Sequence, residues 1–287
     1  MFFLKYIAGL AACIILDLIF TEKAFAWGPG IHTATVLSTL SDASALLPSI
    51  ANIITSFPRE YLYGCLSADF FVGKSKRKNA GHPHNWEGGF RFLSEAGRDR
   101  EAAFAYGFIT HLAADVAAHN IFIPNLINSW PAHKKIGHLY WELRADYIIG
   151  PAYTKFAKKI LGMDNRACDD LITLTARKSS NKLKANKLLY SNSVRISDYF
   201  FSTRNFLFSG PNVRGNEFNR FLGLMIDLSC RLVKDILSNP SKSCCLLYEP
   251  MGSRDLHLTN SKKLFKKIFN TSRPSKALMT DRNYFEA

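Results

Sequence analysis

The chain has 287 residues, of which 47% are hydrophobic and 21% are charged, and its formal net charge is +14. This composition excludes a disordered chain and supplies enough apolar material for one sizeable hydrophobic core. The positive charge favours anionic partners such as phospholipid surfaces or nucleic acid, although such an excess also keeps secreted proteins soluble.

Residues 1–26 have the features of a cleavable secretory signal. Lys5 precedes a short apolar stretch, and the segment closes with an A-x-A pattern that ends at Ala26. An uncleaved anchor helix is the less favoured alternative, because the stretch contains Asp17 and is shorter than the roughly 20 residues of a membrane span. We therefore expect a secreted or periplasmic protein whose mature chain begins at Trp27. Removing the signal takes away two basic and two acidic residues, so the net charge stays at +14.

The mature chain keeps an odd number of cysteines, which are Cys65, Cys168, Cys230, Cys244 and Cys245. None of them forms a C-x-x-C spacing. We interpret them as buried thiols, or as one or two disulfides, and not as a thiolate metal site.

Apolar residues recur at helical spacing along most of the chain, and no strand-like alternation competes with this pattern. Two or three short helices are expected from Thr33 to about Phe57, followed by a loop. A basic connection over 74–89 leads into a helix near Trp86. The later helices are expected at about 98–119, 133–147, 153–161, 169–177, 194–208 and 218–238.

The predicted architecture is therefore an all-α, multi-helix single domain over residues 27–240. Residues 241–287 form a basic C-terminal tail, rich in Ser, Lys, Arg and Asn. This segment is either an amphipathic helix that lies on an anionic membrane surface or a frayed cationic tail, and we favour the tail.

The strongest chemical signal is a row of metal-ligand side chains on one predicted helix. His111, Asp115 and His119 occupy positions i, i+4 and i+8, so they project from nearly the same face. His138 and Glu142 repeat the i, i+4 spacing on the next helix. The flanking residues are apolar or small, and polar groups buried among them without partners would destabilise the fold by several kcal/mol. A bound cation offsets that penalty, and this donor set suits zinc.

These residues resemble the metal-binding motifs of the zinc-dependent phospholipase C family, which also includes single-strand nucleases. The segment from Gly107 to His119 resembles the central metal-binding helix of that family. The segment 64–70 resembles its loop with an essential aspartate, 82–86 its histidine loop, and 138–142 its last ligand pair. An N-terminal Trp exposed by signal cleavage is a further feature of the family.

The resemblance implies up to three zinc ions. The first would be bound by a histidine of the loop, His111 and Asp115, and the third by His119, His138 and Glu142. The second would use the α-amine and carbonyl of Trp27, together with His32 and a bridging Asp115; an α-amine has a low enough pKa to release its proton to a metal. Asp69 would be a further ligand, or the catalytic base that orients the attacking water.

The sequence departs from the family pattern in one place and leaves one choice open. Ala68 stands where the family usually has a proline before the loop aspartate. The loop contains two histidines, His82 and His84. We favour His84 as the ligand because Trp86 lies close to it.

The expected function is zinc-dependent hydrolysis of a phosphodiester, most of all of a phospholipid, with zinc supplying a nucleophile by lowering the pKa of a water molecule. A single-strand nuclease or another phosphoesterase is the alternative within this chemistry, and it makes nucleic acid an alternative substrate. A non-catalytic zinc-binding or membrane-associated protein is the alternative from another class. No obligate protein partner is evident.

Overall fold

The structure, a computed structural model, describes residues 27–71, 83–129, 137–177, 179–202 and 215–252. This part of the chain is helical and contains no strand, which confirms the all-α prediction. The α-helices are α2 (Pro29–Ser41), α3 (Pro48–Ser56), α4 (Pro58–Ser67), α5 (Trp86–Glu95), α6 (Asp99–Ala117), α7 (Ile123–Ser129), α8 (Gly137–Ile149), α9 (Pro151–Leu161), α10 (Arg166–Thr175), α11 (Ser180–Ser202) and α12 (Gly215–Ser238). Three short 3₁₀ turns, η1 (Ala43–Ala45), η2 (Ala68–Phe70) and η5 (Cys244–Leu247), and one π-helical turn, η3 (Ala118–Phe122), accompany them.

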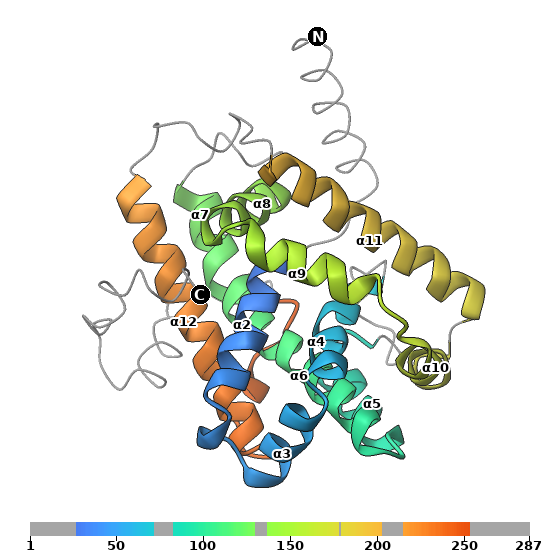
Figure 1. Cartoon of the computed structure of the whole chain (residues 1–287). Coiled ribbons are helices and arrows are strands. Elements are labelled where there is room, and N and C mark those ends of the chain that lie inside the picture. Colours follow the sequence, from blue (N-terminus) through green and yellow to red (C-terminus); the bar gives the residue numbers. More distant parts are fainter. Residues whose placement is uncertain (1–26, 72–82, 130–136, 178, 203–214, 253–287) are drawn as a thin grey trace.

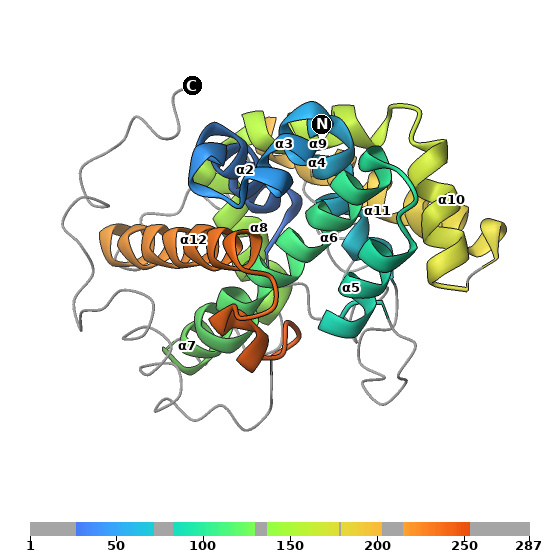
Figure 2. The same ribbon diagram turned by 90° about the horizontal axis from the view of Figure 1, so that it is seen from below.

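Helix α6 is the central element of the fold. It packs against α4, α5 and α12 (Figure 1), and the view from below shows it enclosed by these helices and by α2 (Figure 2). Every residue from Gly107 to Ala117 is buried. A helix that is buried on all sides needs apolar or small residues, so the polar side chains of α6 must find partners inside the protein.

Two glycines allow α4 and α6 to approach closely. A Cβ added to Gly64 would lie 1.9 Å from the carbonyl oxygen of Phe104, and one added to Gly107 would lie 1.9 Å from that of Tyr61. Only glycine permits such close backbone contact. The close approach brings η2, which follows α4 directly, beside the second half of α6.

Helix α4 corrects the sequence prediction, which places a loop after Phe57. Pro58 occupies the first turn of α4, as prolines do in α2, α3 and α9. Proline suits this position because its fixed φ is helical and its missing N–H would have no partner there. The acidic Glu60 in the same turn also favours a helix start.

Two other helices differ from expectation at their ends. The helix expected to reach 119 changes from α to π geometry at Ala118, so His119 lies in the π-helical turn η3. Helix α11 begins at Ser180, well before the expected residue 194. Its first turns are Lys-rich and largely exposed, so they lack the apolar periodicity that the prediction relied on.

The chain beyond α12 packs back onto the helical domain. The Trp86 indole N–H donates to the carbonyl oxygen of Tyr248 (2.8 Å), and the Asn120 amide donates to that of Glu249 (3.0 Å). The described chain thus extends to Gly252, past the predicted start of the tail at 241. The division into signal, domain and tail stays a prediction.

All five cysteines after residue 26 lie in the described segments, and Cys65, Cys168, Cys230 and Cys245 are free thiols. Of the two interpretations above, the structure supports buried thiols: Cys65, Cys168 and Cys245 are buried, and the other two are half-buried. None of the helices in the described segments has the length and apolar character needed to cross a membrane.

Candidate metal centre

Asp115, in the buried half of α6, lies at the centre of a group of histidines. Its Oδ1 lies 3.4 Å from Nε2 of His32 on α2, and its Oδ2 lies 3.2 Å from Nε2 of His111 on its own helix. The His32 and His111 rings are stacked, with centroids 3.9 Å apart and planes 16° from parallel. Each of these rings therefore presents a nitrogen to a different oxygen of the same carboxylate.

His84 reaches the same carboxylate from the loop before α5. Asn85 caps α5 by accepting a hydrogen bond from the backbone N–H of Gly88 (2.7 Å), and this cap fixes the position of the preceding His84. His84 Nδ1 lies 3.1 Å from the carbonyl oxygen of Ala68, and its Nε2 lies 3.2 Å from Asp115 Oδ2. The other candidate in this loop, His82, lies outside the described residues.

Asp69 and His119 complete the inner group. Asp69 Oδ1 lies 3.7 Å from His111 Nε2, and His119 Nε2 lies 3.8 Å from Asp115 Oδ2. Ala68 adopts a φ of −59°, a value within the range that a proline ring fixes. The φ of Ala68 is therefore one that a proline at this position would also adopt.

Trp27 lies beside this group and is completely buried. Its indole N–H is 2.9 Å from the Ser229 hydroxyl and 3.2 Å from the carbonyl oxygen of Ala114, the residue before Asp115. Its ring packs against Phe122 at a centroid distance of 4.5 Å. The indole thus anchors the first residue of the expected mature chain to α6 and α12.

The last expected ligand set is only partly described. Glu142 is buried on α8, with 4% of its surface exposed. The side chain of His138, also on α8, lies outside the description, so the set of His119, His138 and Glu142 stays a prediction.

The centre strongly perturbs its own ionisable groups. Burial alone would raise the pKa of Asp115, but His111, His32 and His84 hold it well below its usual range. Burial, followed by the neighbouring His111 ring, lowers the pKa of His32. The favoured state is therefore an ionised carboxylate beside a neutral His32, which is the state in which both bind metals.

The residues fit divalent zinc. Both ring nitrogens of His32 and of His111, and Oδ1 of Asp115, are buried and lack a hydrogen-bond partner. In a tetrahedral zinc site with bonds of about 2.1 Å, two ligand atoms lie about 3.4 Å apart. The nitrogen–oxygen distances of 3.2–3.8 Å around Asp115 bracket this value. They exceed the roughly 2.7–2.9 Å of a charge-assisted hydrogen bond.

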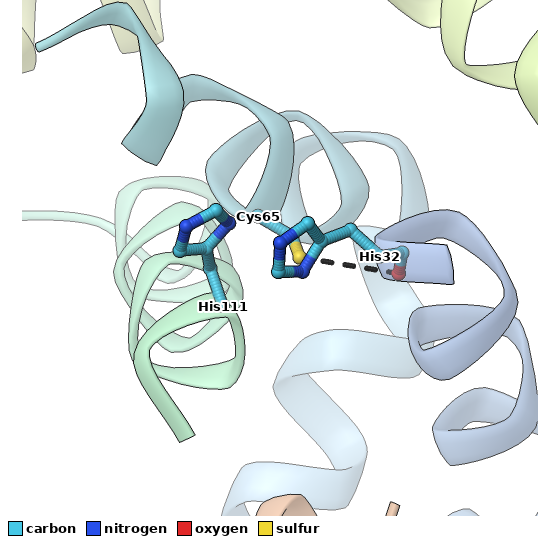
Figure 3. Close-up of side chains that lie close together, drawn as sticks. All are labelled: His32, Cys65 and His111. Atoms are coloured by element: carbon cyan, nitrogen blue, oxygen red, sulfur yellow. Dashed lines mark hydrogen bonds between the residues drawn. The ribbon is translucent and has the colours of Figure 1, made fainter. Parts of the chain in front are cut away.

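Cys65 is a neighbour of the centre that the sequence analysis gives no role. Its sulfur and ligand nitrogens of His32 and His111 lie within 4.8 Å of one another (Figure 3). Ligand atoms of Asp69, His84 and His111 form a second group with the same spacing. The lone pairs of the two imidazoles lie in nearly parallel planes about one ring thickness apart, which favours a separate ion for each ring over one ion shared with Cys65. Burial raises the pKa of the Cys65 thiol, and its sulfur lies 4.0 Å from the His32 carbonyl oxygen, which is consistent with a weak S–H donor.

The buried helical core with carboxylates and imidazoles at its centre defines a helical metal-binding protein. The sequence model of the zinc dependent phospholipase C family matches residues 30–190, more than half of the chain. The chain therefore belongs to the zinc-dependent phospholipase C family and is a zinc-dependent phosphoric ester hydrolase. The family implies a phospholipid-type substrate. Searches of curated proteins and of solved structures gave no match.

Proposed function

We propose that the protein is a secreted hydrolase that uses up to three zinc ions to cleave phosphodiester bonds of phospholipids. The arrangement of His84 is the observation that carries the metal-centred part of this proposal. A carbonyl oxygen only accepts hydrogen bonds, so the contact with Ala68 requires the proton on Nδ1. In the neutral ring, the Nε2 lone pair then faces the Asp115 carboxylate at 3.2 Å. Either a proton on Nε2 or a metal ion must stand between these two acceptors, and metal-binding histidines commonly donate their other N–H to a carbonyl in this way.

The geometry supports Asp115 as a bridge between two ions. The stacked rings of His32 and His111 face its two oxygens separately and lie 3.9 Å apart. Two ions, one held by each ring, would then both contact Asp115, as the shared ligands of two-metal sites do. We therefore assign His111 and His84 to one ion, and His32 with the Trp27 amine and carbonyl to the other.

The chain's own residues bind and orient the reactants. Bound zinc supplies the Lewis acidity that activates water near neutral pH and offsets charge on the phosphate. Asp69, next to His111, either completes the ligand set of that ion or accepts the proton of the attacking water. The buried helices around the centre exclude bulk water, which strengthens every charge interaction within it.

Secretion is part of the proposal, because the Trp27 amine becomes available only after cleavage at Ala26. The complete burial of the Trp27 side chain supports a fixed place for this residue next to α6. Sequencing the N-terminus of protein recovered from the culture medium or periplasm should give Trp27 first. A mature product that keeps residues 1–26 would contradict this part of the proposal.

We also propose that the substrate is presented at an anionic membrane surface. On α11, Lys184, Leu188, Arg195 and Tyr199 are all exposed and follow one another at helical spacing. Two cations and two apolar side chains on one stripe are typical of a helix that contacts a lipid interface. The net charge of +14 also favours binding to an anionic membrane surface. Sedimentation with vesicles of phosphatidylcholine, with and without phosphatidylserine, measures this association.

One assay panel tests the activity. Purified protein of known zinc content is incubated with phosphatidylcholine, phosphatidylinositol, single-stranded DNA and a phosphomonoester, before and after chelation. We expect release of the phosphorylated head group from at least one phospholipid, lost on chelation and restored by zinc. Cleavage of DNA alone would replace phospholipid by nucleic acid as the substrate. Inactivity of the zinc-loaded protein on all four substrates would contradict the proposed function.

A further inference from the structure

We propose that Asp146 is a positioning residue that holds the N-terminal turn of the mature chain in place, so that Trp27 and His32 can bind zinc. This inference rests on the proposed function. Asp146 lies on α8, is buried, and follows Glu142 by four residues and His138 by eight. It continues the row of acidic and imidazole side chains that the sequence analysis ends at Glu142.

The Asp146 carboxylate caps α2 from another helix. Its Oδ2 accepts from the backbone N–H of Gly30 (2.8 Å), and its Oδ1 accepts from that of Ile31 (2.9 Å). The residue at the N-cap position, Gly28, has no side chain, and Pro29 has no N–H. Asp146 therefore replaces the missing cap and interacts favourably with the positive end of the helix dipole.

Two glycines make room for this carboxylate. A Cβ on Gly28 would lie 2.4 Å from Asp146 Oδ2, and one on Gly30 would lie 2.9 Å from Asp146 Cγ. The three nearest atoms to each added Cβ all belong to Asp146. The backbone on both sides of Pro29 is thus fitted to this one side chain.

The position of this turn determines two expected zinc ligands. His32 directly follows Ile31, and its N–H bonds to the Gly28 carbonyl oxygen (3.2 Å). Trp27 directly precedes Gly28, and its indole is anchored between α6 and α12. The backbone of residue 27 is therefore held on one side by its own indole and on the other by Asp146.

Zinc affinity of the mature protein tests the inference. In Asp146→Asn, one backbone N–H meets an amide NH₂ instead of an acceptor, so the turn must shift. We expect zinc affinity, measured by competition with a chelator, to fall by about 10- to 100-fold for at least one ion, as when outer partners of metal ligands are removed. The Trp27 α-amine, protected by zinc in the unchanged protein, should become reactive towards an amine-specific reagent.

Asp169→Asn is the matched control. Asp169 lies on α10 and accepts from the Tyr63 hydroxyl and from Lys187 Nζ (2.6 Å), neither of which is an expected metal ligand. This variant should melt at a lower temperature but keep the zinc affinity and amine protection of the unchanged protein. A purely structural role for Asp146 would give the same result as this control.

Gly30→Ala provides a second test that keeps the carboxylate, and it decides the question if Asp146→Asn does not fold. It should also weaken zinc binding, because its Cβ displaces Asp146. Wild-type zinc affinity in a folded Asp146→Asn variant, or in Gly30→Ala, would overturn the inference. If instead the zinc affinity depends on Asp146 as expected but the unchanged protein hydrolyses none of the four substrates, the proposed function fails and the inference stands.

Discussion

The close crossing of α4 and α6 predicts a large effect from a single methyl group. In Gly107→Ala, the new Cβ would lie 1.9 Å from the Tyr61 carbonyl oxygen, whereas ordinary contact begins near 3.4 Å. The helices must therefore separate by about 1.5 Å at this point. Overpacking of this kind destabilises proteins by about 1–3 kcal/mol, which for a domain of this size lowers the melting temperature by roughly 2–12 °C.

The same displacement should weaken the metal centre, because η2 follows α4. The 3.7 Å distance between Asp69 and His111 would increase, and zinc affinity should fall with it. Thermal unfolding of the metal-free protein by circular dichroism and zinc competition measure the two effects. Gly223→Ala on α12 is the control: its Cβ would meet nothing within 4 Å, so it should melt at the same or a slightly higher temperature. A Gly107→Ala protein with wild-type stability and zinc affinity would refute the reasoning.

Three further predictions concern the metal centre. Asp115→Asn should abolish activity and tight zinc binding, since the amide cannot bridge two ions, and full hydrolysis by this variant would contradict the bridging role. One extra residue before Trp27 should weaken zinc binding by displacing the amine, and an unchanged zinc content would show that this amine is not a ligand. The folded state lowers the pKa of His32 from 6.5, so this group destabilises the metal-free protein as the pH falls below about 6.5. Burial raises the pKa of Asp146 to about 7, which has the opposite effect, so the His32 contribution is measured as the difference between the unchanged protein and His32→Gln in denaturant unfolding at pH 5, 6, 7 and 8. Identical pH profiles for the two proteins would contradict it.

Much of the helical fold could be predicted from the sequence, because helical periodicity is local. The row of His111, Asp115 and His119 identified the most buried helix, since three polar groups among small and apolar residues stand out in such a segment. The boundaries were harder to predict. The exposed first turns of α11 show no apolar stripe, and the start of α4 depends on the preference of Pro58 for the first helical turn, which is not an apolar pattern.

The contacts between elements could not be predicted in the same way. Helical spacing predicts the helix face on which Asp115 lies. It does not predict which carboxylate oxygen contacts His32 and which contacts His111. That pairing depends on how α2 packs on α6, which only the tertiary structure shows. The proximity of Cys65 has the same origin, because it depends on the glycine contact between α4 and α6. The sequence could have indicated a role for Asp146, since this residue continues the i, i+4 row of His138 and Glu142.

The rows of ligand-type side chains on α6 and α8 differ in whether their carboxylates need a metal ion to be stable. On α6, the row lies inside the core, where an ionised Asp115 among imidazoles is stable only with compensating charge. On α8, the final member of the row, Asp146, is already satisfied by two backbone N–H groups and needs no metal. A metal-free chain should therefore keep the α2–α8 contact while its centre around α6 loosens, and hydrogen exchange should be faster at His111 than at Gly30. The expected difference in exchange follows from the partners of the two carboxylates. Asp146 is stabilised by backbone N–H groups that belong to the fold, whereas Asp115 would be stabilised by bound ions.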